Sequence, residues 1–115
     1  SMPCIKVKVN QELINEDKQQ LAAILSKKTA ELLAKPEKYV MVIIEDNISI
    51  SMSASYEPAA YIEFKSINLP ENNTVLLSEA ICRLIHEQLT IETQRIYIEF
   101  SNAQRHLWGW NESTF

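Results

Sequence analysis

The chain is short of glycine and has no cysteine cluster, and both shortages exclude common kinds of site. Gly109 is its only glycine, so no glycine-rich loop is present to hold a phosphate group. The two cysteines, Cys4 and Cys82, lie far apart and form no CxxC pair, which favours buried or lone thiols over a disulfide or metal framework. The two histidines, His86 and His106, lack a ligand-like spacing, so we expect no metal site.

Positive charge is also scarce, and long apolar runs are missing. The chain has 11 Lys and Arg against 15 Asp and Glu, a net charge of −4, so its composition does not indicate binding to nucleic acid or to an anionic membrane. No apolar run approaches the ~18–20 residues of a membrane span, and no signal peptide is recognisable ahead of Pro3. We therefore expect a cytoplasmic protein, or one that leaves the cell by a non-classical route.

The chain has enough apolar residues to form one hydrophobic core. It has 115 residues, of which 46% are hydrophobic, a size and composition typical of one domain. We expect this domain to span residues 3–115. Ser1 resembles the residue left after cleavage of an affinity tag and Met2 an initiator, so both are excluded from the expected fold.

The same strand–helix–strand unit is written twice along the chain. In the first copy, residues 4–9 alternate between apolar and polar, which is the period of a strand. Asn15 is the expected N-cap of a helix that should end at Lys35-Pro36, because the residue before a proline is disfavoured in helical geometry. The apolar run 39–44 follows, and a continuous run predicts a strand covered on both sides. The expected buried stripe of the helix is Leu21, Leu25, Leu32 and Leu33, with Ala22 and Thr29 between them.

The second copy has the same order. Residues 60–65 and 95–100 are expected strands, and the helix between them should be capped by Asn73 or Thr74. Strand–helix–strand crossovers make parallel pairs and are almost always right-handed. We therefore expect an α/β fold in which duplicated βαβ units form one four-stranded mixed sheet with two helices on one face. The other face should be apolar, because strand 39–44 has apolar residues on both sides, and self-association should bury it.

Pro3 is the residue with the most distinctive chemistry. A proline at the start of a chain carries a secondary amine, whereas an ordinary α-amine titrates near pH ~7.7–8.0. Burial disfavours the ammonium form and lowers the pKa, so an uncharged Pro3 nitrogen would serve as a general base near neutral pH. While Ser1-Met2 remain attached, this nitrogen is an amide without useful basicity. We expect a natural Met-Pro start to lose its methionine, because the aminopeptidase accepts a small second residue.

Several short motifs occur in an order and spacing that resemble a known family. They are residues 32–41 (LLAKPEKYVM), Glu57-Pro58, Ser66-Ile67, 95–98 (RIYI) and 110–115 (WNESTF). Together with the proline start and the doubled βαβ plan, they resemble the macrophage migration inhibitory factor (MIF) family of the tautomerase superfamily over essentially the whole chain. The resemblance implies a homotrimer whose three sheets surround a central channel. It also implies keto–enol tautomerisation of phenylpyruvate-type acids and isomerisation of dopachrome analogues, with no cofactor.

The resemblance further implies roles for individual residues. Pro3, once free, would be the catalytic base, and Lys35 and the backbone of Ile67 would hold the carboxylate and oxygen atoms of a small aromatic α-keto acid. Tyr97 and Glu99 would come from a neighbouring subunit to complete the pocket. Its aromatic wall would be formed by Trp108, Trp110 and Phe115.

Three departures from the family pattern modify these expectations. Glu99 stands where the family has asparagine, and a carboxylate there would raise the pKa of Pro3 and repel an anionic substrate. We therefore expect weaker activity towards hydroxyphenylpyruvate. Asn68 replaces the glycine of a Ser-Ile-Gly stretch, where glycine normally permits backbone freedom. The cysteine pair behind the family's proposed thiol–disulfide activity is absent from residues 59–62, so we expect no redox function.

Each of these residues also has a plainer explanation. Pro3 would lead a strand, as proline often does, Lys35 would interact with a helix dipole, and Tyr97 would be an ordinary strand aromatic. In a different function class, the chain would be a cytokine-like binding protein that engages a receptor and has a vestigial pocket. A third alternative is a related tautomerase that acts on a halogenated or unsaturated acid.

Overall fold

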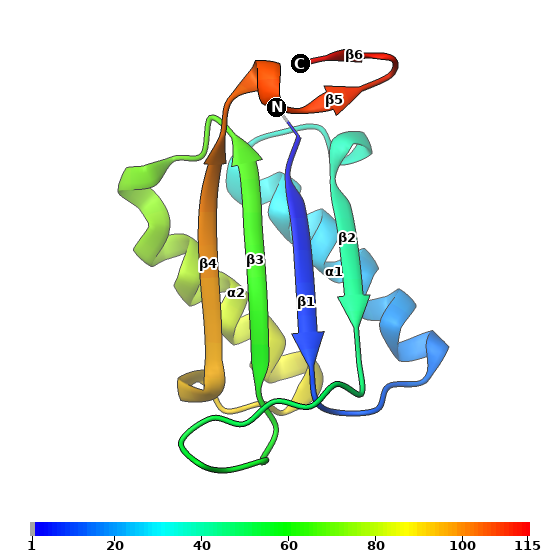
Figure 1. Ribbon diagram of the computed structural model, residues 1–115, viewed down its shortest axis with the longest axis vertical. Coiled ribbons are helices and arrows are strands. Elements are labelled where there is room, and N and C mark those ends of the chain that lie inside the picture. The colour runs from blue at the N-terminus through cyan, green and yellow to red at the C-terminus, as the bar shows by residue number, and fades with distance from the viewer. Residues whose placement is uncertain (1) are drawn as a thin grey trace.

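Two parallel strand pairs, joined through an antiparallel contact, form one four-stranded sheet with both long helices on a single face (Figure 1). This computed structural model describes residues 2–115. Ser1 lies outside the described residues, so its interpretation as a tag remnant stays a prediction. Neither helix within residues 2–115 combines the length and apolar character needed to cross a membrane.

The first βαβ unit consists of β1 (Cys4–Val9), α1 (Asn15–Leu33) and β2 (Met41–Glu45). The residue that caps α1 is Ile14, without a side-chain hydrogen bond, so the expectation that Asn15 is the N-cap was wrong. Helix α1 ends where Ala34 adopts a left-handed conformation with φ 52°, which closes the last turn before Pro36.

The second unit repeats this plan with β3 (Ala60–Ile67), α2 (Thr74–Leu89) and β4 (Ile96–Ala103). Asn73 occupies the cap position of α2, one of the two expected residues, although its side chain makes no capping hydrogen bond. At the other end Thr90 is left-handed with φ 58° and its backbone N–H bonds to the carbonyl of His86. Both units therefore end their helix in the same way, without glycine.

The sheet order is β2-β1-β3-β4, which confirms the predicted duplication. Strand β1 pairs with β2 in parallel and with β3 antiparallel, and β3 pairs with β4 in parallel. Short 3-10 turns connect these elements: η1 (Glu37–Tyr39), η2 (Glu71–Asn73), η3 (Thr93–Arg95) and η4 (Arg105–Leu107). The chain closes with a small hairpin of β5 (Gly109–Trp110) and β6 (Ser113–Thr114), which lies beyond one end of the sheet near the N-terminus (Figure 1).

The core lies between the sheet and the two helices. Alternate residues of β1 and β3 point into it, as the sequence alternation predicts. The spacing of apolar residues predicts a stripe of Leu77, Ala80, Ile81, Leu84 and Ile85 on α2, and all of these except Ala80 are buried. The stripe of α1 is buried at Leu21, Leu25 and Thr29. Leu32 and Leu33 are only partly buried and pack at the margin of the core.

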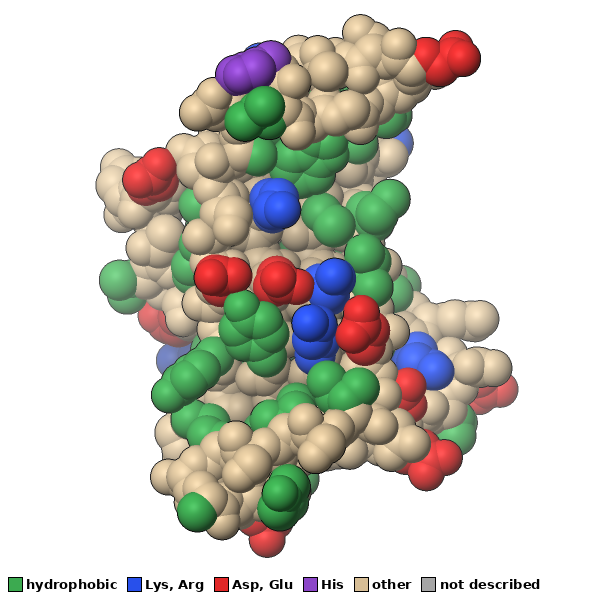
Figure 2. Space-filling model, viewed as in Figure 1, with side chains coloured by type: hydrophobic (Ala, Val, Ile, Leu, Met, Phe, Trp, Pro, Cys, Tyr) green, Lys and Arg blue, Asp and Glu red, His purple; other side chains and the backbone are tan. Residues whose placement is uncertain are grey.

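The face of the sheet away from the helices is charged, so the expectation of an apolar face was wrong. The strand register places Lys6 beside Glu63 and Glu63 beside Glu99, and Lys6 pairs with Glu63 at 3.8 Å. Figure 2 shows acidic and basic side chains gathered across the middle of this face. Strands β1 and β3 alternate, so their apolar residues go to the helix side and their polar residues to the open side. Strand β2 adds apolar side chains on this face through Met41 and Ile43.

Strand β2 itself differs from its prediction in two ways. Residues Glu37–Tyr39 form a 3-10 turn, so the strand begins at Met41 instead of Tyr39. It lies at the sheet edge with β1 as its only strand neighbour, which leaves Met41 56% exposed within the chain. The apolar run 39–44 predicts a strand covered on both sides, whereas β2 is an edge strand with one side left open by this chain.

The connection between β2 and β3 contains the Glu57-Pro58 motif and is held in place by Arg95. The Arg95 guanidinium donates hydrogen bonds of 3.0–3.1 Å to the backbone carbonyls of Met52, Ser55, Glu57 and Pro58. Asn10 adds hydrogen bonds from its amide nitrogen to the carbonyls of Tyr56 and Glu57. Arg95 thus has a structural role at the end of the sheet opposite to Pro3.

Thr29 offers a test of the core. Its side chain is fully buried, and its hydroxyl has no hydrogen-bond partner among residues 2–115. Thr29→Val should stabilise the folded chain by about 1 kcal/mol, because it replaces an unsatisfied polar group by a methyl of similar size. Denaturant unfolding measures this change. Thr29→Ser is the matched control and should destabilise, since it keeps the hydroxyl and loses the methyl. A Thr29→Val chain that unfolds at lower denaturant than wild type would contradict the packing described.

Candidate active site

Pro3 lies immediately ahead of β1, at the end of the sheet next to the β5–β6 hairpin (Figure 1). It is buried, and its carbonyl accepts a hydrogen bond of 3.0 Å from the backbone N–H of Met41. Cys4, the first residue of β1, pairs with Lys65 in the antiparallel register of β1 and β3. Pro3 therefore lies next to the end of β3, where Ser66 and Ile67 follow Lys65.

Lys35 reaches the same place from the end of α1. Its Nζ donates one hydrogen bond of 2.8 Å to Ser66 Oγ and a second, short one to the carbonyl oxygen of Ile67. Ser66 Oγ in turn donates to the Ile67 carbonyl at 3.0 Å. A lysine ammonium has three donors, so Lys35 keeps one N–H for another partner. The three residues form a connected polar group beside Pro3.

A second cation acts on Lys35. Burial is the main cause that lowers the pKa of Lys35 below its ordinary value, and the charge of Arg105 lowers it further. Arg105 opens η4, two positions after Ala103, and Ala103 is the register partner of Ile67. The C-terminal ends of β3 and β4 thus bring Arg105 to the end of the sheet that Lys35 occupies.

Three aromatic rings pack together next to this end. Trp110 and Phe115 stack with centroids 5.0 Å apart, and Tyr39 meets both edge-on at 5.7 and 6.4 Å. The β5–β6 hairpin makes this possible, because it turns the chain back so that the Phe115 N–H bonds to the Trp108 carbonyl. The Trp108 ring does not join the cluster. It lines a hollow on the open sheet face instead.

Tyr97 and Glu99 lie on the open face of β4, apart from the Pro3 side of the sheet. Tyr97 is 64% exposed. Glu99 accepts a hydrogen bond of 3.0 Å from the Tyr61 hydroxyl, and this bond raises the pKa of Tyr61. A single chain therefore does not bring these two residues to Pro3. Their placement on an edge strand leaves them free to meet another subunit.

The hollow on the open face has a volume of about 740 Å³ and extends from Glu99 to Trp108 and Gly109. Cys4 also lines it, and burial raises the pKa of this thiol. Within residues 2–115, no three His, Cys, Asp or Glu side chains converge into a metal-binding group.

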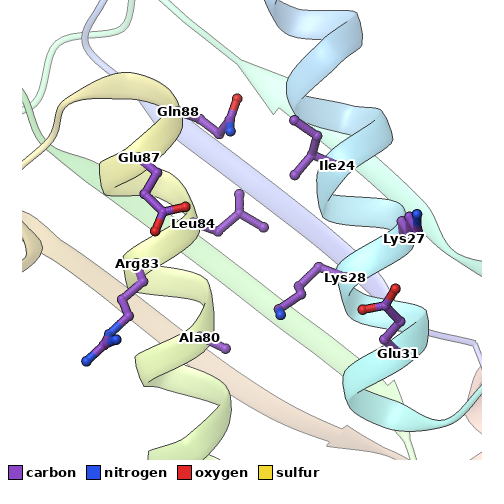
Figure 3. Close-up of a pocket in the computed structure, with 9 residues that line it drawn as sticks. All are labelled: Ile24, Lys27, Lys28, Glu31, Ala80, Arg83, Leu84, Glu87 and Gln88. Carbon is purple, nitrogen blue, oxygen red and sulfur yellow. The ribbon is translucent and has the colours of Figure 1, made fainter.

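A second hollow, of about 400 Å³, lies between α1 and α2 on the other side of the molecule (Figure 3). Ile24 and Leu84 provide apolar side chains, while Lys28, Glu31 and Arg83 provide mixed charges. None of the predicted site residues lines this groove. The chemistry-bearing residues are concentrated at the Pro3 end of the sheet.

The sequence predicts no role for three residues of this region, Tyr39, Ser66 and Arg105. Tyr39 and Ser66 stand inside the quoted motifs, but which of their neighbours they contact depends on how η1 and β3 meet the rest of the fold. Arg105 had no sequence signal, because only the register of β3 and β4 shows that η4 begins near Lys35.

A family model described as macrophage migration inhibitory factor (MIF) matches residues 2–115. The chain belongs to this family. MIF proteins are members of the tautomerase superfamily, so membership supports an isomerase of the tautomerase type or a cytokine-like function.

Individual MIF proteins show the extent of the similarity. The chain is 31% identical to the macrophage migration inhibitory factor of Xenopus tropicalis over 98 residues, which cover 83% of this chain and 84% of the relative. The crystal structure of a homologue from Prochlorococcus marinus is 40% identical, with a TM-score of 0.92 over 97% of this chain and 98% of that one. An MIF-like protein from Entamoeba histolytica is 25% identical, with a TM-score of 0.93 over the full length of both chains.

The two cations give a prediction about Lys35. Arg105→Gln should raise the pKa of Lys35 part of the way to its ordinary value, because it removes a repelling charge and leaves the burial in place. Between the lowered folded pKa and the ordinary one, the unfolded chain binds more protons, so stability rises with pH in that window. NMR titration of the Lys35 Cε resonance measures the change. Arg83→Gln, on α2 beside Glu79, is the control and should leave the titration unchanged, and an equally unchanged curve for Arg105→Gln would contradict the proximity.

Proposed function

We propose that the chain, once it begins at Pro3, is a tautomerase that interconverts the keto and enol forms of phenylpyruvate-type acids. The observation that carries this proposal is the convergence of three features at one end of the sheet. Pro3 is buried there, Lys35 is bonded to Ser66 and Ile67 beside it, and an aromatic cluster of Tyr39, Trp110 and Phe115 is built on the adjoining elements.

The base in this reaction is the secondary amine of Pro3. Removal of the two residues before it converts its nitrogen from an amide into an amine. Burial disfavours the charged form of that amine, and so does the Lys35 ammonium nearby. The nitrogen is then unprotonated near neutral pH, where it accepts the proton from the carbon next to the keto group.

Lys35 supplies the opposite charge that the reaction needs. As the carbon-bound proton leaves, negative charge develops on the keto oxygen, and a fixed donor aimed at that oxygen lowers the barrier. Lys35 has one N–H left after its bonds to Ser66 and Ile67. Those two bonds hold the ammonium still, so little rearrangement is needed during the reaction. A water molecule then protonates the enolate oxygen to give the enol, and Pro3 releases the proton that it accepted to solvent, which regenerates the base.

The aromatic cluster accounts for the other end of the substrate. Trp110 is 44% exposed, so its face is available to a phenyl ring. Aromatic rings pack on one another in offset or edge-on arrangements that contribute about 0.5–1.5 kcal/mol beyond the area buried. The substrate class is therefore an aryl-substituted α-keto acid.

The complete site is assembled between subunits of a homotrimer. Both β2 and β4 are edge strands with one free side, and Tyr97 lies exposed on β4. Edge-to-edge pairing of subunits would cover these strands and bring Tyr97 and Glu99 to the Pro3 end of a neighbour. The charged open faces would then line a water-filled channel, which suits their Lys and Glu side chains better than a dry contact.

The test is to prepare the chain with Pro3 as its first residue and to follow enol formation from phenylpyruvate optically. Activity should appear only after Ser1-Met2 are removed. Pro3→Gly should then lose about 10²–10⁴-fold in kcat, the usual contribution of a positioned base. A folded trimer that begins at Pro3 and does not react would contradict the proposal and would favour a cytokine-like binding protein.

Glu99 gives a second prediction for the same protein. A carboxylate that reaches the pocket of a neighbouring subunit repels an anionic substrate and favours the protonated amine. Glu99→Asn should therefore lower the KM for hydroxyphenylpyruvate and move the acid limb of the pH–rate profile to lower pH. Glu16→Gln, at an exposed position in the first turn of α1, is a control for the loss of one negative charge. An unchanged KM and acid limb in Glu99→Asn would show that Glu99 does not reach the pocket.

A further inference from the structure

Arg105 is a cation at the Pro3 end of the sheet without a described counterion. The ion pairs within residues 2–115 join Lys6 to Glu63, Lys18 to Asp46 and Arg83 to Glu79, and none includes Arg105. The turn after β3 does carry Glu71, but its carboxylate accepts a hydrogen bond of 2.6 Å from the Asn102 amide. Arg105 is exposed, so its guanidinium is accessible to a ligand.

The fold directs this cation towards Lys35. Ile67 and Ala103 are the last residues of β3 and β4, and they are register partners. Lys35 is bonded to the Ile67 carbonyl, and Arg105 follows Ala103 by two residues at the start of η4. Backbone bonds from Leu107 to Gln104 and from Trp108 to Arg105 fix that turn. The two side chains thus start from neighbouring strand ends.

Two cations held near each other repel, and an anion between them removes the repulsion. Lys35 alone is a weak clamp for a carboxylate, since two of its three N–H groups are occupied by Ser66 and Ile67. A guanidinium offers a planar pair of donors that matches the two oxygens of a carboxylate.

We propose that Arg105, next to Lys35, binds the carboxylate of the substrate, and that it sets a preference for α-keto acids over their uncharged derivatives. This inference rests on the proposed tautomerase function. With the carboxylate on Arg105, the remaining N–H of Lys35 is free for the keto oxygen. Arg105 then contributes equally to binding in the ground state and in the transition state, so its loss should change KM and leave kcat nearly unchanged.

The experiment compares phenylpyruvate with its methyl ester in chains that begin at Pro3. Arg105→Gln should raise the KM for the acid about tenfold, with kcat within about twofold of wild type, the loss expected for one charged hydrogen-bonded contact of ~1.4 kcal/mol. The KM for the uncharged ester should stay unchanged. Arg105→Lys should recover part of the loss, and Arg83→Gln is the matched control and should behave as wild type. Added salt should raise the KM for the acid less steeply in Arg105→Gln than in wild type.

Equal effects on acid and ester, or no effect on either, would overturn the inference. The proposed function fails separately, if wild type that begins at Pro3 turns over neither compound. In that case binding of 3-phenylpropionate and of its uncharged amide is measured by calorimetry. Weaker binding of the acid alone in Arg105→Gln would still support the clamp, and identical binding of the acid by Arg105→Gln and wild type would refute it.

Discussion

The hydrogen bonds from Lys35 to Ser66 and Ile67 are the contact on which the rest of this molecule depends. Lys35 follows the helix of the first βαβ unit, and its two acceptors end the first strand of the second unit. The contact therefore joins the duplicated halves near Pro3, which immediately precedes β1. It also fixes a cation in a half-buried position, where burial and Arg105 both lower its pKa. A charge held in this way acts strongly on a neighbouring amine, because its surroundings screen it less than water does.

Most of the fold could be predicted from the sequence. The alternation of β1, the apolar spacing of the helices and the repeated order predict two βαβ units in one mixed sheet. The sequence did not predict that β1 and β3 are the strands that join the two units. The open face could not be predicted from β2, because an edge strand with apolar residues on both sides looks like a buried strand in sequence. Strands β1 and β3 place charges on this face, and the edge position of β2 is set by tertiary pairing with β1. The cap of α1 was mispredicted because Ile14 occupies the cap position without a side-chain hydrogen bond.

Site residues could be predicted from the sequence only where a family motif contains a group that is able to react or to bind a substrate. Pro3, Lys35 and Ile67 stand in such motifs, and the structure places them at one end of the sheet. Of the predicted aromatic wall, Trp110 and Phe115 stack and Tyr39 packs against both, while Trp108 lines the hollow on the open face and its role in a substrate pocket stays a prediction. Arg105 was not foreseen, because proximity to Lys35 arises from the register of two strands. One chain does not contain the proposed partners of Tyr97 and Glu99, because these partners belong to another subunit.

The most direct test of the account is the pKa of the Pro3 nitrogen in the assembled protein that begins with this residue. Labelling Pro3 with ¹⁵N and following its chemical shift with pH measures it without any substrate. Burial and the Lys35 ammonium predict a value clearly below the ~7.7–8.0 of an ordinary α-amine, with an increase towards that range in Lys35→Met. A Pro3 nitrogen that titrates at or above the ordinary value, and does not respond to Lys35→Met, would contradict the proposal that this end of the sheet contains a general base.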